Sequence, residues 1–341
     1  MTGDPRRAPD GAHARTGEHL ELGQGPEFDL IRRFLSQWAD AARGIGGDCA
    51  TLDVPRNAKL VLSVDTSVED VHFRRAWLTP AEIGYRATAA ALSDLAAAGA
   101  APLAVLLALS APASWMPELP AVADGVGQAA RDSGTMVVGG DTTGGPALIL
   151  SVTVAGAALR PLTRAGARAG DRVYVSGRLG GPAAALRAWA ADETPDAEAR
   201  ARFARPAPRL REGQWLAAHG VTAAVDISDG VVADLGHIAA ASGVRISIDL
   251  DRVPRWPTTT AIDAAASGEE YELAVTATHA VDAAAFEREF GIPLTQVGEV
   301  TSGAPAVEVS VAGVRVAPIP GYDHFSSVSE LGRERRDIEP R

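Results

Sequence analysis

The sequence predicts a two-domain protein of the α+β class, with strands and helices in α/β-type layers. Its 341 residues are more than one small hydrophobic core usually serves. In each half, apolar runs of strand length are followed by segments with helical spacing, and some strands follow one another directly. Between the halves, residues 160–181 are rich in arginine and glycine, which indicates a crossing between domains.

The first half begins with a pattern of apolar residues at helical spacing over residues 26–39. "KLVLSVDTSV" (59–68) follows as a strand that ends in polar residues. Residues 79–100 begin with a Thr–Pro helix entry and continue as an alanine-rich helix to Gly99. The remaining predicted elements are a strand over 103–112, a helix over 116–134, a short strand over 135–140 and a strand over 147–159. We take residues 26–158 as the N-terminal domain.

The second half repeats this alternation after a helix at 181–190. Residues 191–213 read as a polar, proline-bearing stretch. A strand, a loop and a helix are predicted over 221–243, a strand over 244–254, and further alternation as far as "GYDHF" (321–325). We take residues 159–328 as the C-terminal domain, residues 1–25 as a flexible tail and residues 329–341 as a charged tail.

The composition excludes several classes of function. A net charge of -11 argues against nucleic acid or an anionic membrane surface as the main partner, although metal ions can bridge acidic protein to a phosphorylated substrate. No apolar run is long enough to span a bilayer, and the N-terminus lacks a secretory signal, so we expect a cytoplasmic protein. Cys49 is the only cysteine, so an intrachain disulfide is excluded. Lys59 is the only lysine and no glycine-rich loop precedes it, which disfavours a P-loop and a protein-kinase site.

Asp141 lies in "VVGGDTTGG" (137–145), where the predicted strand ends among glycines. The glycines let the backbone bend and let a bulky group come close. A carboxylate in this place either caps a turn or holds a cation.

Three other aspartates of the first half raise the same choice. Asp48 lies in "GIGGDCA" and is either a turn residue or a ligand. Asp65 ends the predicted strand, where a polar residue often only caps or anchors a loop. Asp94 lies inside a helix among alanines and leucines, where a carboxylate is costly unless it binds a metal or pairs with an arginine such as Arg86.

The second half contributes "DISDGVVADLGH", in which Asp226 and Asp229 flank Ser228 before a predicted helix. A helix cap by Ser228 or Asp229 is the alternative to a ligand role, and the two can coexist. We expect Asp234 and His237, further along this helix, to lie at the surface or behind the ligands.

The acidic pattern continues at Glu269 in "SGEEYEL", where we expect one of Glu269 and Glu270 to face water. The aspartates thus recur at strand ends and loops beside glycines, with few histidines near them. Oxygen ligands in such positions suit Mg²⁺, which is usually held by a few carboxylates together with substrate phosphates. The pattern therefore predicts phosphoryl transfer in which metal ions stabilise the charge.

With these residues assembled, the chain resembles the thiamine-monophosphate kinases of the aminoimidazole-ribonucleotide synthetase superfamily. The resemblance runs from about "PEFDLI" to "GYDHF" and rests on the order and spacing of these motifs: "GIGGDCA", "SVDTSVEDVHF", "LSDLAAAGA", "VVGGDTTGG", "LTRAGARAGD", "DISDGVVADLGHI", "SGEEYEL" and "GYDHF". It implies a fold of two α/β-type domains, with ATP and Mg²⁺ bound by the N-terminal domain and a homodimer paired through the N-terminal domains. It also implies direct transfer of the γ-phosphate of ATP to thiamine monophosphate with Mg²⁺.

The resemblance also implies roles for individual residues. The implied metal ligands are Asp48, Ser63, Asp65, Asp94, Asp141, Asp226 and Asp229. The implied ATP contacts are Gly140, Asp141, Arg164 and Ser228, and the implied contacts to thiamine phosphate are His72, Glu269 and Tyr322. Catalysis is assigned to Asp141, Arg164 and Asp229.

The chain departs from the family pattern at a few positions. The family usually has "GDD" where this chain has Gly47 and Asp48, a threonine is common at Val64, and the usual "GED" is Gly-Glu-Glu at 268–270. These departures bear on the number of metal ions. Selenophosphate synthetase and the hydrogenase-maturation relative need cysteine or lysine residues that the chain lacks. The alternatives are another ATP-using member, such as aminoimidazole-ribonucleotide synthetase, a metal-dependent phosphohydrolase, or a non-catalytic binding descendant.

Overall fold

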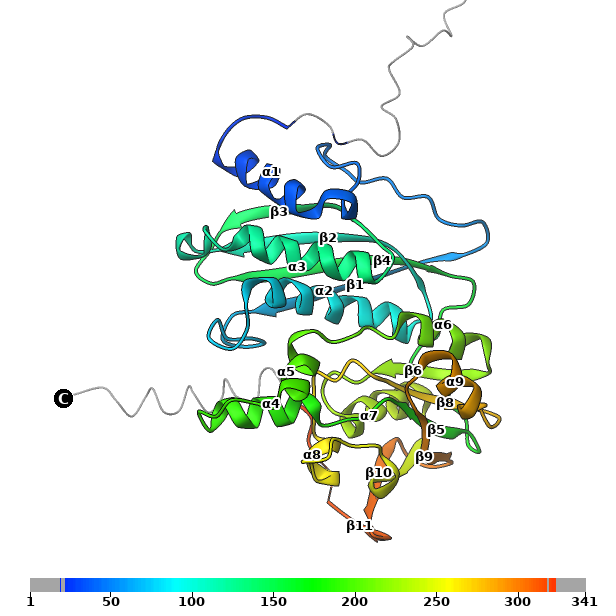
Figure 1. Ribbon diagram of the computed structural model, residues 1–341. Helices are drawn as coiled ribbons and strands as arrows, with labels where there is room; N and C mark the ends of the chain where they lie inside the picture. Colours follow the sequence, from blue (N-terminus) through cyan, green and yellow to red (C-terminus); the bar gives the residue numbers. More distant parts are fainter. Residues whose placement is uncertain (1–18, 20–21, 318, 323–341) are drawn as a thin grey trace, which may run out of the picture.

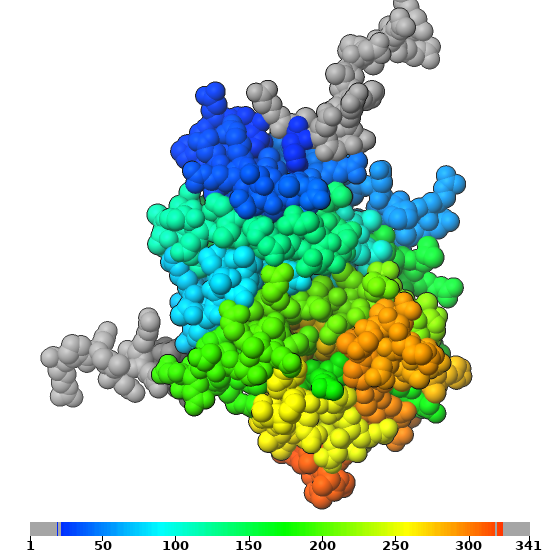
Figure 2. Space-filling view, in the orientation of Figure 1, coloured from blue at the N-terminus to red at the C-terminus, as the bar shows by residue number. Residues whose placement is uncertain are grey.

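The computed structural model describes residue 19, residues 22–317 and residues 319–322. These residues form two stacked halves, each built on its own sheet, and the chain passes from one to the other between β4 and β5 (Figure 1). The space-filling view shows the same stacking, with blue to blue-green residues in one half and green to red residues in the other (Figure 2). The α+β class with two layered halves is therefore confirmed.

The first half contains a four-stranded sheet and three α-helices. In chain order its elements are α1 (Pro26–Trp38), β1 (Lys59–Val68), α2 (Pro80–Ala97), β2 (Ala101–Ala111), α3 (Leu119–Asp132), β3 (Val137–Gly144) and β4 (Ile149–Ala158), with short 3₁₀ turns at Ala39–Ala41 and Ala113–Trp115. The strand order is β1-β4-β2-β3, in which β4 runs antiparallel to β1 and β2, and β3 runs parallel to β2. β1 and β3 are therefore the two edges of this sheet.

Helix α2 is the element on which both halves pack. It begins with a capping box, in which Thr79 and Glu82 each accept a backbone N–H from the other, and Pro80 occupies the first turn. Its alanine-rich surface is buried on nearly every side. It crosses α3 so closely that a Cβ on Gly125 would lie 1.8 Å from the carbonyl oxygen of Ala81. Small residues here allow two helix backbones to touch.

The second half is built on a seven-stranded sheet. Its elements are β5 (Arg172–Ser176), α4 (Gly181–Ala190), α5 (Ala197–Ala204), α6 (Leu210–Ala218), β6 (Val221–Asp226), α7 (Val231–Ser242), β7 (Arg245–Asp249), a 3₁₀ turn (Leu250–Arg252), α8 (Ala261–Ala265), β8 (Leu273–Ala277), α9 (Ala283–Phe290), β9 (Leu294–Thr301), β10 (Ala306–Val311) and β11 (Val314–Arg315). The strand order is β11-β10-β7-β9-β5-β8-β6. One hydrophobic core extends from the first half into the second, joining Leu95 of α2 to Phe203 of α5 and Leu216 of α6.

The places of Asp65 and Asp141 within their strands differ from the prediction. β1 continues past Asp65 because it pairs with β4 as far as Val68, and β3 continues past Asp141 because it pairs with β2. Both aspartates are thus strand residues and neither stands at a strand end. Gly140 has a packing reason, because a Cβ there would lie 1.9 Å from the carbonyl oxygen of Leu107 on the neighbouring strand.

The remaining differences lie in segments read as irregular. Residues 160–181 contain strand β5, and residues 191–213 contain α5 and the start of α6. Most of the predicted N-terminal tail, the C-terminal tail and residues 323–325 of "GYDHF" lie outside the described residues. Within the described part of the chain, no helix is both long and apolar enough to cross a membrane.

Candidate active site

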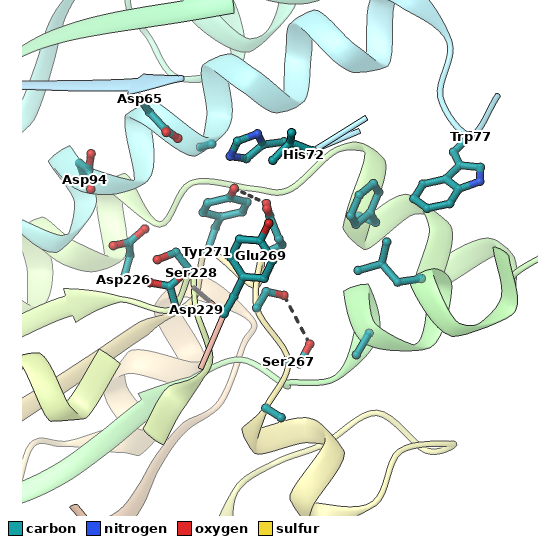
Figure 3. Close-up of a pocket in the computed structure, with 18 of the residues that line it drawn as sticks. Asp65, His72, Trp77, Asp94, Asp226, Ser228, Asp229, Ser267, Glu269 and Tyr271 are labelled. Atoms are coloured by element: carbon teal, nitrogen blue, oxygen red, sulfur yellow. Dashed lines mark hydrogen bonds between the residues drawn. The ribbon is translucent and has the colours of Figure 1, made fainter. Parts of the chain in front are cut away.

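A pocket of about 540 Å³ opens between the two halves. Its walls come from β1 and the segment after it, from α2, from α4 and from the loops that follow β6 and precede β8. Figure 3 shows three aspartates, Asp65, Asp94 and Asp226, at one side and Trp77 at the opposite side, with His72, Glu269 and Tyr271 between them. The pocket therefore has an acidic end and an aromatic end.

The acidic end draws one carboxylate from each of three elements. Asp65 projects from β1, Asp94 from the interior of α2 and Asp226 from the end of β6. Ser63, two residues before Asp65 on the same face of β1, donates its hydroxyl hydrogen bond to Asp94. The backbone N–H of Thr66 donates to Asp65 at 2.7 Å. The alternative reading of Asp94 as the ion-pair partner of Arg86 is wrong, because Arg86 pairs with Glu269 instead.

Burial raises the pKa of all three carboxyl groups, and the charge of Asp94 adds to the rise for Asp65 and Asp226. Desolvation is the main cause for Asp65, Asp94 and Asp226, and for Asp226 the charge of Asp94 adds to it and brings the pKa to about 7. The positive charge of Arg164 opposes the rise in pKa of Asp94 and Asp226. Half-buried to buried carboxylates that face one pocket are stabilised when a divalent cation binds beside them, so the chemistry of this donor set fits Mg²⁺. The ligand atoms of the three do not all lie within 4.8 Å of one another.

The loop after β6 is held by Asp234, which is buried and not at the surface. Its carboxylate accepts the backbone N–H groups of Ser228, Asp229 and Gly230, each at 3.1 Å. Neither Ser228 nor Asp229 caps α7 with its side chain, because the cap residue is Gly230 at φ 113°. Burial and the charge of Asp226 raise the pKa of Asp234 to about 7. Asp234 thus sets the loop that presents Ser228 and Asp229 to the pocket.

Donor atoms of Asp229, Asp234 and the exposed His237 also lie within 4.8 Å of one another. The carboxylate of Asp234 already accepts three backbone N–H groups, so it serves to hold the loop. The cluster therefore adds acidic groups behind the loop, next to the acidic end of the pocket.

Glu269 and His72 lie between the two ends of the pocket. Nδ1 of His72 accepts the N–H of Val68 at 3.1 Å, so the neutral ring carries its proton on Nε2. Glu269 accepts hydrogen bonds from Tyr271 and from Arg86 through the same oxygen, Oε2. Burial, followed by the charge of Glu269, raises the pKa of Tyr271 well above its ordinary value, so its hydroxyl remains a donor.

The expectation that one of the two glutamates faces water is wrong. Glu269 lines the pocket and Glu270 is fully buried on the opposite side of the segment, where it accepts from the N–H of Gly180 and the hydroxyl of Ser267. Glu269 and Tyr271 both adopt left-handed backbone conformations, with φ of 62° and 52°. Such conformations are unfavourable for side chains of this size and cluster at functional sites.

The structure brings most of the predicted site residues together. Lining the pocket are Asp65, His72, Asp94, Arg164, Asp226, Ser228, Asp229, Glu269 and Tyr322, and Ser63 contacts Asp94 from behind. Asp48 is exposed and does not line the pocket. Gly140 and Asp141 line a separate cavity of about 90 Å³ beside α1, on the edge strand opposite β1.

Several pocket residues were not predicted from the sequence. Arg86 does not line the pocket, but it contacts Glu269 and Phe203 of its wall. The signal for it was its spacing, since Arg86, Ala90 and Asp94 follow at four-residue intervals on one face of α2. The lining residues that were not predicted are Trp77, Leu186, Phe203 and Tyr271. They come from four separate segments, so no local pattern joins them.

Comparison with known families defines the class of this protein. Residues 46–158 match the N-terminal domain of AIR synthase related proteins, and residues 168–310 match the C-terminal domain of the same family. The two matches together cover most of the chain in the order that the structure shows. The chain therefore belongs to the AIR synthase related proteins. The relatives described next show that, among these proteins, it belongs to the thiamine-monophosphate kinases.

The thiamine-monophosphate kinase of Salmonella typhimurium is 38% identical over 276 residues, which are 73% of this chain and 82% of the relative. That of Mycobacterium tuberculosis is 36% identical, over 75% of this chain and 78% of the relative. These relatives make the chain a phosphotransferase.

Solved structures give the same result. The thiamine-monophosphate kinase of Stenotrophomonas maltophilia superposes with a TM-score of 0.73 at 36% identity, covering 85% of this chain and 98% of the other. A complex of AaThiL with AMPPCP, an ATP analogue, and TMP superposes with a TM-score of 0.68 at 29% identity, covering 87% and 96%.

Proposed function

We propose that this chain phosphorylates thiamine monophosphate to thiamine diphosphate, with ATP as the donor and Mg²⁺ as the metal. The observation that supports it most is the division of the pocket into an acidic end and an aromatic end. Thiamine monophosphate carries an aromatic cation at one end and a phosphate at the other. Trp77, Leu186 and Phe203 suit the rings, and the aspartates suit a metal-bound phosphate chain.

The metal ligands in this proposal are Asp65, Asp94, Asp226 and Asp229, with Ser63 orienting Asp94. Bound Mg²⁺ supplies the positive charge that phosphate oxygens need in phosphoryl transfer. Asp48, Gly140 and Asp141 remain candidate ligands of the metal and ATP, although within one chain they lie apart from the pocket.

The other pocket residues position and neutralise the substrates. Arg164 lies close enough to Asp94 and Asp226 to lower their pKa, and from there its guanidinium can bind the transferred phosphoryl oxygens. Nε2–H of His72 and the hydroxyl of Tyr322 are donors for the phosphate of thiamine monophosphate. The carboxylate of Glu269 faces the thiazolium cation. We propose direct in-line transfer, since positioning and charge neutralisation are sufficient for it.

We also propose a homodimer paired through the first half. One face of its sheet packs on α2 and α3, and the other face exposes Leu60, Leu62 and Val64 of β1, with 48%, 63% and 63% of their surfaces accessible. Apolar rows of this kind usually mark an interface. Since β1 and β3 are opposite edges, face-to-face pairing by a two-fold axis can bring Asp141 of one subunit to the Asp65 edge of its partner.

The direct test measures ADP release with ATP and Mg²⁺, in the presence of thiamine monophosphate and with water alone. We expect release that depends on thiamine monophosphate and yields thiamine diphosphate. Equal release with water alone would indicate a phosphohydrolase, and no release a binding protein. Asp94→Asn should abolish turnover, whereas Asp29→Asn, at an exposed ion pair with Arg32, should not change it. Isolation of a phosphorylated enzyme that passes its phosphoryl group to the substrate would overturn direct transfer.

A further inference from the structure

Arg86 is a buried cation that joins the two halves at the pocket. It projects from α2, and only 3% of its surface is accessible. Its guanidinium donates to the carbonyl oxygen of Phe203 and to Oε2 of Glu269, and it lies 3.8 Å from the centre of the Phe203 ring. Three contacts thus hold the guanidinium, and they come from helix α5 and from the loop before β8.

We propose that Arg86 is a positioning residue, which holds Glu269 in the orientation that receives thiamine monophosphate. The proposal rests on the proposed function, because Glu269 is the residue placed against the substrate. Both Arg86 and the hydroxyl of Tyr271 donate to Oε2 of Glu269. Within the described part of the chain this leaves Oε1 for a ligand.

The need for such a residue follows from the backbone of the loop. Glu269 and Tyr271 are held in left-handed conformations, so the loop tends to relax unless its contacts hold it. The rear of the loop is fixed, because Arg209 pairs with the buried Glu272 and Arg202 pairs with Glu270. At the front, the contacts of Arg86 and Tyr271 with Glu269 are what orient its carboxylate.

Stability alone does not explain the pair. A buried ion pair is often no more stabilising than apolar residues of the same volume, because both charges lose their water. What the pair provides is a fixed position of Glu269 relative to Asp94. Arg86 and Asp94 are two turns apart on the same face of α2, so about 12 Å of rigid helix separates the residue that orients Glu269 from the metal ligand. The helix sets the spacing between the two ends of the substrate.

The test compares Arg86→Met, Arg86→Lys and Glu269→Gln with a matched control, Arg205→Met. Arg205 also lies 3.8 Å from an aromatic ring centre, that of Tyr85, but outside the pocket. For Arg86→Met we expect the KM for thiamine monophosphate to rise about tenfold, the effect of losing one charged hydrogen bond, while the KM for ATP stays within about twofold. Arg86→Lys, which keeps the charge, should recover part of the loss. Arg205→Met should change neither KM.

A double variant separates positioning from simple destabilisation. Arg86→Met combined with Glu269→Gln should be no worse in KM than the more severe single variant, because both remove the same interaction. Additive effects, or equal changes in the two KM values, would overturn the inference.

A wild-type protein that fails to convert thiamine monophosphate would instead overturn the proposed function. In that case, urea denaturation of the wild type, Arg86→Met, Glu269→Gln and the double variant decides whether the contact exists. Non-additive changes in stability support the contact, and additive changes refute it.

Discussion

Asp226→Asn should stabilise the metal-free protein while it abolishes turnover. The substitution keeps the size of the side chain and removes a charge that is costly because it is buried and because Asp94 repels it. The pKa of Asp226 is about 7, against 3.8 for an ordinary aspartate. At 1.36 kcal/mol for each pKa unit, ionisation of this group costs the folded protein up to about 4 kcal/mol at pH 8. Asparagine avoids this cost.

The sign of the pH dependence follows from the raised pKa. Between about pH 4 and 7 the folded protein keeps a proton on Asp226 that the unfolded chain has released. The contribution of this group to stability is therefore greatest below its unfolded pKa of 3.8 and falls as the pH rises through 7. The advantage of Asp226→Asn should shrink to less than about 2 kcal/mol at pH 5.

Urea denaturation in EDTA at pH 5 and pH 8, with and without Mg²⁺, measures these effects. Mg²⁺ at about 100 times its Kd should stabilise the wild type by about 2.7 kcal/mol and the variant by much less. The control is Asp171→Asn, since Asp171 is buried outside the pocket and accepts from Arg168 and Thr222. It should lower stability and leave the effect of Mg²⁺ unchanged. An Asp226→Asn protein that is no more stable than wild type at pH 8, and equally stabilised by Mg²⁺, would refute the reasoning.

Three further predictions concern the dimer and the helix packing. Leu62→Glu should convert the protein to monomers in sedimentation, and an unchanged dimer would place the interface elsewhere. If the site is shared between subunits, a one-to-one mixture of re-paired Asp94→Asn and Asp141→Asn chains should recover about a quarter of wild-type activity, whereas a site within one chain predicts none. Gly125→Ala should cost at least about 1–3 kcal/mol in urea denaturation, since its Cβ would press on the carbonyl oxygen of Ala81; wild-type stability would show that α2 and α3 can move apart.

Elements with a clear hydrophobic period could be predicted from the sequence, and α5 and α6 could not. β1 and α2 follow their predicted ranges to within a few residues. In residues 191–213 arginines make part of the interior contacts, such as Arg202 and Arg209 on Glu272, beside buried apolar residues such as Phe203, so the apolar spacing that signals a helix is weak. Strand ends were missed where a strand continues through polar residues because its neighbour pairs with it.

The candidate site likewise contains residues that could be predicted from the sequence and residues that could not. Asp94 and Asp226 were predictable because a carboxylate inside an apolar segment is costly unless it is paired or binds a metal. The contact between Arg86 and Glu269 was not, because it joins residues 183 positions apart and depends on how the halves pack. The burial of Glu270 could not be predicted either, since it depends on a contact with Gly180, which lies 90 positions away in the sequence.

Because side chains alternate along β1, one face of the strand contributes to the pocket and the other forms part of the exposed apolar surface. Leu60 and Leu62 are exposed on the open face of the sheet, whereas Ser63, which donates to Asp94, and Asp65, which lines the pocket, lie on the other face. Deleting one residue early in the strand would exchange the two faces, so that carboxylates would meet the open face and leucines the acidic end. The strand should therefore tolerate many substitutions but no change in length, and insertions and deletions in this region should be confined to the loop of residues 46–58 that precedes it.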